Sequence, residues 1–295
     1  MTAEAAPRIV SLLPSATEIV YALGLEDRLE GVTDECDWPP AARTKRSVVR
    51  ALQPAGLSAA EVDAWVREQA PSGGLYALDE TAMAAIAPDL VLTQDLCRVC
   101  AVPTGDVDAA LERAGCPSRV VTLEPQRLDE VIASVATVAD AAGVPLRGRE
   151  VVAALRARLA VVREAVSAFE PVPTLVLEWL DPPYTAGHWV PDVVTAAGGI
   201  PLLGEAGGRS REATWDEVRA TRPEVTVLAP CGLSPERAWE QAASLPDGVL
   251  TDRTVAMDLA RPGPRLVDCV EALAAVLHPA AGLVHRPDLA AEPPA

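Results

Sequence analysis

The sequence predicts an α/β protein of two lobes, each with a central, mostly parallel sheet flanked by helices. In both halves short apolar runs alternate with amphipathic helical segments, a pattern that favours parallel sheets. Between the halves, residues 147–168 keep apolar residues at helical spacing. The chain of 295 residues is long enough for two lobes of about 100 to 150 residues each. We expect an N-terminal lobe over 1–140, a connecting helix over 141–168 and a C-terminal lobe over 169–295.

The first lobe opens with a strand, a turn and a helix. Pro14 to Glu18 supply turn and cap residues between the apolar run before them and the amphipathic run after them. The predicted strands of this lobe are 8–13, 28–33, 89–93 and 119–123, and its predicted helices are 19–25, 58–68 and a short one that ends near residue 88. A further helix over 127–142 precedes the long connecting helix.

The second lobe restarts the same pattern after Pro171 and Pro173. Its predicted strands are 174–178, 224–229 and 254–258, and its predicted helices are 190–197, 214–221, 234–244 and 264–277. The proline-rich tail after His285 is expected to be frayed.

Charge and hydropathy exclude two classes of partner. The formal net charge is −17 and Lys45 is the only lysine, so a basic face for nucleic acid is not expected. The sequence contains no apolar run of about 18 residues, the length that membrane insertion requires. The N-terminus has no basic region followed by an apolar segment, so the chain as written is expected in the cytoplasm. A periplasmic or extracellular location would require a truncated sequence.

Common catalytic motifs are missing. The sequence has no phosphate-binding loop, no Gly-x-Ser-x-Gly and no His-Glu-x-x-His. A binding protein is therefore favoured over an enzyme, although thiolate chemistry at a cysteine remains open.

Four cysteines follow predicted strands in three separate segments: Cys36, Cys97, Cys100 and Cys231. The carboxyl ends of parallel strands meet at one edge of a sheet, so these thiols are candidates for a shared site. Thiolates at such spacing suit zinc, Cu(I) or an iron–sulfur cluster. The alternative is that they are small buried apolar residues. Cys116 and Cys269 are expected to be packing residues.

A second group of candidates surrounds the first strand of the second lobe. Glu178 ends that strand, and His188 follows in the loop before the next helix. His188 is a candidate cobalt ligand, zinc ligand or proton carrier; the alternative is that it caps the following helix or donates to a backbone carbonyl. His278 and His285 are expected at the surface.

Aromatic residues lie in the same loops although they form only 3% of the chain. Their flat side chains would offer stacking area to a macrocycle, and nearby carboxylates would accept hydrogen bonds from its amides. The aromatic candidates are Trp38, Trp179, Tyr184 and Trp189, and the carboxylates are Glu35, Asp37 and Glu178; Trp65, Trp215 and Trp239 are expected in the core.

Three segments carry a resemblance to a known family: residues 8–24 (RIVSLLPSATEIVYALG), Leu78-Asp79 with 87–94 (APDLVLTQ), and 261–268 (RPGPRLVD). From Arg8 to His278 the chain resembles helical-backbone (class III) solute-binding proteins, in the vitamin B12-binding branch. The resemblance implies two lobes that close on a ligand held in a cleft between them, a small-molecule metal chelate such as cobalamin or another corrinoid. The four cysteines and the missing export segment depart from that pattern, so the chain is most similar to cytosolic proteins described as cobalamin-binding.

Three functional hypotheses follow. The leading one is a corrinoid- or metal-chelate-binding protein. The second is a cytosolic protein that binds zinc or an iron–sulfur cluster through its cysteines and is redox-active. The third is a transporter receptor, with an ABC permease as partner only if an export signal precedes this sequence. We expect Cys36, Cys97 and Cys100 of one lobe to face Glu178, His188 and Cys231 of the other.

Overall fold

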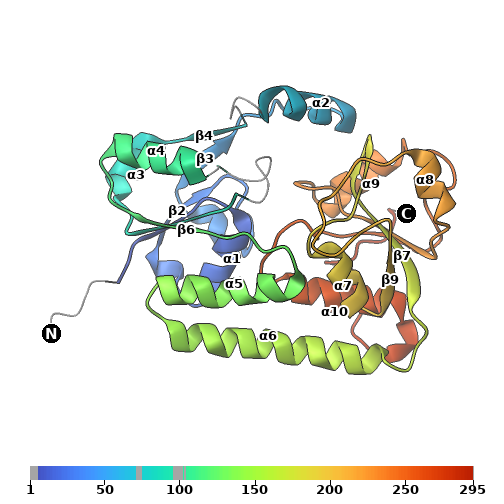
Figure 1. Cartoon of the computed structure of the whole chain (residues 1–295). Coiled ribbons are helices and arrows are strands. Elements are labelled where there is room, and N and C mark those ends of the chain that lie inside the picture. Colours follow the sequence, from blue (N-terminus) through green and yellow to red (C-terminus); the bar gives the residue numbers. More distant parts are fainter. Residues whose placement is uncertain (1–5, 71–74, 96–101, 103, 295) are drawn as a thin grey trace. The chain divides into compact units, whose positions relative to one another are not determined.

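The computed structural model describes residues 6–70, 75–95, 102 and 104–294. These residues form two compact units, and Figure 1 labels their elements. Unit 1 holds the described residues up to Gly56 with Ala64–Glu124 and Ile132–Ala153, and unit 2 holds Leu57–Asp63, Pro125–Val131 and the chain from Ala154 onward. The domain limits at residues 140 and 168 stay a prediction.

Within the described part of unit 1, six strands form one sheet in the order β4-β3-β2-β1-β5-β6. They are β1 (Ile9–Ser11), β2 (Leu29–Thr33), β3 (Ser47–Ala51), β4 (Tyr76–Leu78), β5 (Leu90–Thr93) and β6 (Arg119–Thr122). All neighbours are parallel except β3 and β4. Because β1 lies between β2 and β5, the strand order reverses there, as it does at the ligand-binding edge of many open α/β sheets.

Helices cover this sheet. They are α1 (Pro14–Ala22), α3 (Glu80–Ile86) and α4 (Thr104–Ala114), with the 3-10 helices η1 (Glu26–Arg28) and η2 (Pro40–Thr44). Asp79 caps the start of helix α3, and its carboxylate accepts a hydrogen bond from the Ala82 N–H at 2.8 Å. Helices α3 and α4 pack over one sheet face, where Met83 and Val107 join a buried apolar cluster.

The chain passes from one unit to the other within three helices: α2 (Ala59–Gln69), α5 (Leu128–Ala141) and α6 (Pro145–Val166). Helices α5 and α6 run side by side (Figure 1), and they approach closely where Gly148 faces Ala139. A Cβ at position 148 would lie 2.4 Å from the Ala139 Cβ, so only glycine fits at this approach.

The described strands of unit 2 form a second sheet around one long central strand. They are β7 (Val172–Leu180), β8 (Pro183–Thr185), β9 (Gly199–Leu202), β10 (Val225–Leu228) and β11 (Thr254–Ala256), with β10 between β7 and β11. On its other side, β7 pairs with β9 along its first half and antiparallel with β8 along its second half. The strand order therefore reverses at β7, which brings the carboxyl end of that strand to the edge where ligands commonly bind.

The helices of unit 2 are α7 (Val190–Ala196), α8 (Trp215–Ala220), α9 (Pro235–Ala242) and α10 (Leu266–Leu277), followed by η4 (Pro279–Ala281). Helices α8 and α9 bury Val218 and Ala238 against one sheet face. Helix α8 starts with a capping box between Thr214 and Glu217. Among the helices that the structure describes, none combines the length and the apolar character needed to cross a bilayer.

The fold class of two largely parallel sheets flanked by helices is confirmed, and several local predictions were wrong. Helix α1 begins at Pro14 rather than at residue 19, so residues predicted as turn and cap form its first turn. The tail is packed rather than frayed: Ala290 is fully buried, and Ala291 pairs with Ala256 and accepts a hydrogen bond from the Trp239 indole at 3.0 Å. His278 is buried rather than at the surface, with its Nε2 3.0 Å from the Gly198 carbonyl oxygen. The last two outcomes depend on partners distant in sequence.

Four strands were not predicted from the sequence: β3, β4, β8 and β9. They are short and only partly buried, so they lack the continuous apolar run that marks a central parallel strand. Their pairing partners define them.

An ion-pair cluster within unit 2 generates the first prediction. Arg158 on α6 donates to Glu271 at 2.7 and 2.8 Å and also pairs with Asp268, both on α10. We expect Arg158→Met to lower the free energy of unfolding by about 1 kcal/mol, because two half-buried carboxylates lose their cation. The loss is no larger because solvent screens these partly exposed ion pairs. Thermal melting measures this. Arg156→Met, at an exposed position of the same helix, is the matched control, and equal melting of the two variants would contradict the prediction.

Candidate functional site

The candidate site is built at the carboxyl end of β7 in unit 2. The Ala229 N–H donates to the Leu177 carbonyl at 2.9 Å, and the Cys231 N–H donates to the Glu178 carbonyl at 3.0 Å. The chain that leaves β10 therefore continues beside the end of β7, so residues from both strand ends share one edge. We call this region, with Glu178, Gly187, His188, Ser210 and Cys231, the β7 edge.

The Glu178 carboxylate joins two loops at this edge. It accepts a hydrogen bond from the Gly187 N–H at 2.9 Å and another from the Ser210 hydroxyl. Gly187 belongs to the loop before α7, and Ser210 to the segment between β9 and α8. Each carboxyl oxygen takes one of these bonds, so one side chain joins two segments that are 23 residues apart in sequence.

Close backbone packing places His188 in an unusual conformation. A Cβ at Gly187 would lie 2.3 Å from the Ser210 backbone nitrogen, so no side chain fits there. His188 has a φ of +49°, a left-handed conformation that costs a non-glycine residue about 1–2 kcal/mol. Its N–H donates to the Gly208 carbonyl at 2.6 Å, and its carbonyl accepts from the Gly207 N–H at 2.9 Å. These two bonds hold the strained residue in place.

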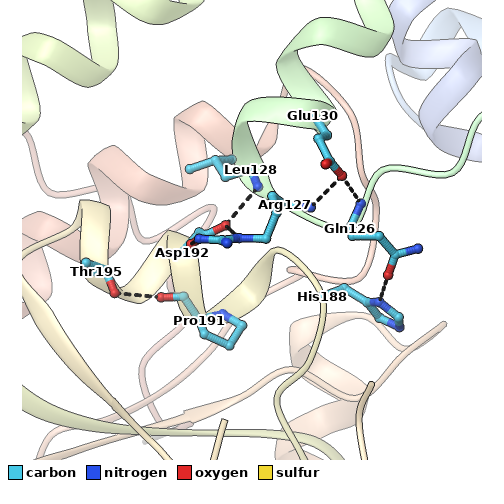
Figure 2. A network of polar contacts seen from close by, with 8 residues as sticks. All are labelled: Gln126, Arg127, Leu128, Glu130, His188, Pro191, Asp192 and Thr195. Atoms are coloured by element: carbon cyan, nitrogen blue, oxygen red, sulfur yellow. Dashed lines mark hydrogen bonds and ion pairs between the residues drawn. The ribbon is translucent and has the colours of Figure 1, made fainter. Parts of the chain in front are cut away.

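The His188 imidazole contacts Gln126 and Trp189. Its Nδ1 lies 2.9 Å from the Gln126 Oε1 (Figure 2), and its ring stacks on the Trp189 ring with centroids 5.7 Å apart. Burial and the positive charge of Arg209 lower the pKa of His188 from its ordinary value. The imidazole is therefore neutral at physiological pH.

Gln126 is held by an ion pair beside it (Figure 2). Arg127 donates to the Asp192 carboxylate at 2.7 and 2.8 Å, and the Leu128 N–H donates to the same carboxylate at 3.1 Å. The Glu130 carboxylate accepts from the Gln126 and Arg127 N–H groups at 2.6 and 3.2 Å. Burial raises the pKa of Asp192, but the hydrogen bonds from Arg127 and Leu128 lower it more. Asp192 therefore stays ionised and anchors the start of α5 on α7.

The aromatic residues predicted for the site differ in their burial and in their hydrogen bonds. The Trp179 indole donates to the carbonyls of Ala59 and Asp181 at 3.3 and 3.1 Å, and the Tyr184 hydroxyl lies 3.3 Å from an Asp63 carboxylate oxygen; both rings are half-buried in unit 2. Trp189 is instead buried, and its indole donates to the Leu259 carbonyl at 2.8 Å. Its ring stacks on the His188 ring and is buried, so it does not line the surface.

The remaining tryptophans also differ from expectation in part. In unit 1, Trp38 exposes 45% of its surface. Trp65, Trp215 and Trp239 are half-buried rather than in the core, and the last two pack against the apolar cluster of unit 2. Of the carboxylates predicted beside the aromatic rings, Asp37 lies 3.7 Å from Arg43, and Glu35 begins a turn in which its N–H donates to the Thr33 hydroxyl at 3.2 Å.

The cysteines divide between the units. Cys36 is buried in unit 1, with its Sγ 3.1 Å from the Thr17 hydroxyl and 3.3 Å from the Thr33 hydroxyl. Cys231 is exposed at the β7 edge of unit 2. Cys97 and Cys100 lie outside the described residues, so a shared thiolate site stays a prediction. Cys116 and Cys269 are buried packing residues, as predicted.

Within the part of the chain that the structure describes, no group of three or more His, Cys, Asp and Glu side chains is arranged to hold a metal ion. Nothing in the comparisons below points to an iron–sulfur protein either. Zinc and iron–sulfur binding therefore gain no support from the described residues.

Sequence reasoning found Glu178 and His188 but missed the residues that hold them. Gln126 and Arg127 lie at the start of the helix predicted over 127–142, which was given no part in the site, and Ser210 lies between the predicted helices 190–197 and 214–221, where no element was predicted. Gly207 and Gly208 permit a tight backbone there, but no local pattern indicates which strand end that backbone contacts. These partners are fixed by tertiary contacts.

Comparisons with known proteins agree with this architecture. A vitamin B12-binding protein of Vibrio cholerae serotype O1 is 24% identical over 274 residues, which cover 90% of this chain and 87% of that protein. The crystal structure of the periplasmic vitamin B12 binding protein of Vibrio cholerae matches with a TM-score of 0.65 and 24% identity, covering 94% of this chain and 98% of that chain. A periplasmic heme binding protein from Pseudomonas aeruginosa matches with a TM-score of 0.75 and 23% identity, covering 98% of both chains.

The family model described as "Periplasmic binding protein" matches residues 9–257, which is most of the chain. That span begins at β1 and ends just past β11, so it contains both sheets and the long helix between them. The chain belongs to the periplasmic binding protein family.

Proposed function

We propose that this protein binds a corrinoid, such as cobalamin, or a related planar metal chelate, and that it presents this ligand to an ABC permease. The observation that carries the proposal is the match to the vitamin B12-binding protein of Vibrio cholerae, which covers 90% of this chain and 87% of the relative. A match of both chains over nearly their full lengths supports a shared mode of action better than one confined to a single unit would.

The β7 edge has the chemistry that such a ligand requires. Two half-buried aromatic rings, Trp179 and Tyr184, offer apolar area close to the end of the strand. His188 offers a neutral nitrogen, and carboxylate and backbone groups offer hydrogen-bond partners for amide side chains. A few polar groups on an apolar surface are typical of small-molecule sites.

Iron porphyrin is the competing ligand, favoured by the likeness to the heme binding protein of Pseudomonas aeruginosa. Porphyrin and corrin are both flat macrocycles with a central metal, and they differ at their edges. Heme carries two carboxylates, whereas the corrin edge carries neutral amides. The net charge of −17 opposes a dianionic ligand and favours one with neutral edges.

Calorimetric titration tests the choice of ligand. We expect heat and a saturable isotherm with cobalamin or cobinamide at about 10 µM protein, a concentration that detects binding free energies near −7 kcal/mol. Hemin is titrated in parallel and is expected to bind more weakly. Silence with both corrinoids would contradict the proposal, and tighter binding of hemin would transfer it to porphyrins.

Trp38 offers a second test because its side chain is exposed, so truncation costs little stability. If Trp38 stacks on the ligand, Trp38→Ala weakens corrinoid binding about tenfold, or ~1.4 kcal/mol. Leu146→Ala is the matched control, because Leu146 is a 68% exposed apolar residue on α6. Unchanged affinity in Trp38→Ala, or an equal loss in both variants, would remove Trp38 from the site.

A further inference from the structure

We propose that His188 is a direct ligand to the metal, and that its Nε2 occupies an axial position of the bound chelate. This inference rests on the proposed function and names the residue that coordinates the metal. Three geometric observations carry it: the tautomer of the imidazole, the availability of Nε2 and the rigidity of the backbone.

Gln126 sets the tautomer. The atom that faces His188 Nδ1 at 2.9 Å is the Gln126 Oε1, an acceptor (Figure 2). Nδ1 must therefore carry the proton and donate it, which leaves the lone pair on Nε2. Metal-binding histidines are commonly arranged in this way, with the non-ligating nitrogen donating to an oxygen that fixes the ring orientation.

Nε2 is available. Among the described residues, no hydrogen bond or ion pair involves this atom, since the polar contact of the His188 ring is the one through Nδ1. The alternative role as a helix cap is not realised, because α7 has no side-chain cap and the ring bonds to Gln126 instead. The ring is thus fully oriented while one nitrogen remains open.

The backbone at His188 is held in a conformation that it would not adopt alone. Its φ of +49° persists because Gly207 and Gly208 bond to both sides of the residue and because Glu178 fixes the adjoining Gly187 and Ser210. Non-glycine residues in the left-handed region of φ/ψ space cluster at functional sites, where the strained backbone orients a side chain. Trp189, buried behind the ring and stacked on it, blocks rotation of the imidazole.

The charge state also suits ligation. Burial and the nearby Arg209 lower the pKa of His188 from its ordinary value of about 6.5, so the lone pair is not taken by a proton at pH 7. The other charged groups near the ring are Arg127 and Glu130 at the start of α5 and Asp192 on α7. They bond to one another or to the backbone. Binding is a ligand exchange: Nε2 forms a bond to cobalt as a coordinated water leaves, and neither cobalt nor imidazole changes oxidation state.

The test is a visible-absorption titration with diaquocobinamide, a corrinoid with water on both axial positions and no base of its own. We expect the wild-type protein to shift the corrin bands as nitrogen replaces water. His188→Ala should lose this shift. His285→Ala, a change at an exposed histidine 3.5 Å from Glu292, is the matched control and should keep it.

Two failures are distinguishable. If the wild-type protein gives calorimetric binding but no band shift, or if His188→Ala keeps the shift, His188 is not a ligand while the proposed function stands. If the wild-type protein gives neither heat nor shift, both the ligation and the proposed function are overturned. Melting curves establish that each variant is folded.

Gln126→Leu tests the same idea without touching the ligand atom. Loss of an orienting partner typically weakens metal binding about 10–100-fold, so we expect the shift to saturate at about tenfold higher cobinamide. Addition of free imidazole to His188→Ala should restore the shifted spectrum. An affinity in Gln126→Leu equal to that of the wild type would contradict the tautomer argument.

The shift should also depend on pH. Protonation of Nε2 competes with the metal, so the shift is present at neutral pH and is lost on acidification, with a midpoint below about 6.5. His188→Ala is measured at each pH, so that acid–base changes of the corrinoid itself cancel. A midpoint above this value, or a shift independent of pH, would contradict ligation by His188.

Discussion

The β7 edge depends on the hydrogen bonds that one carboxylate accepts. Glu178 lies near the end of the nine-residue strand β7, and the sheet fixes its position through pairing on both sides. From there it binds the Gly187 N–H and the Ser210 hydroxyl. This carboxylate adds to the backbone hydrogen bonds that His188 makes with Gly207 and Gly208, so the loop before α7 and the segment before α8 are joined at several points around the strained backbone of His188.

A second constraint acts through the start of α5. The carboxylate of Asp192 accepts three hydrogen bonds from Arg127 and Leu128, and this anchors Gln126 beside His188 (Figure 2). An exposed ion pair contributes only about 0–1 kcal/mol to stability. The consequence for the site is larger than that figure, because the pair fixes the start of α5, where the Gln126 Oε1 meets His188 Nδ1 and leaves the lone pair on Nε2.

The site also shows how aromatic residues from one short stretch of sequence take separate roles. Trp179 and Tyr184 keep part of their surface accessible, whereas Trp189 is buried and uses its indole to bind the Leu259 carbonyl. A buried tryptophan needs a partner for its N–H. Placing it directly after His188 converts a packing residue into a rigid backing for the imidazole.

The sequence by itself determined the fold class, because alternating apolar runs and helical periods follow from local chemistry. It also determined that Glu178 and His188 stand at a strand end, since side chains after parallel strands meet at one edge. The tertiary structure alone decided that Gln126 meets His188, that Trp189 and His278 are buried, and that the tail packs on β11. Each of these depends on residues distant along the chain, some by as many as 80 positions, and the pairing energy of such contacts leaves no periodic trace in the sequence.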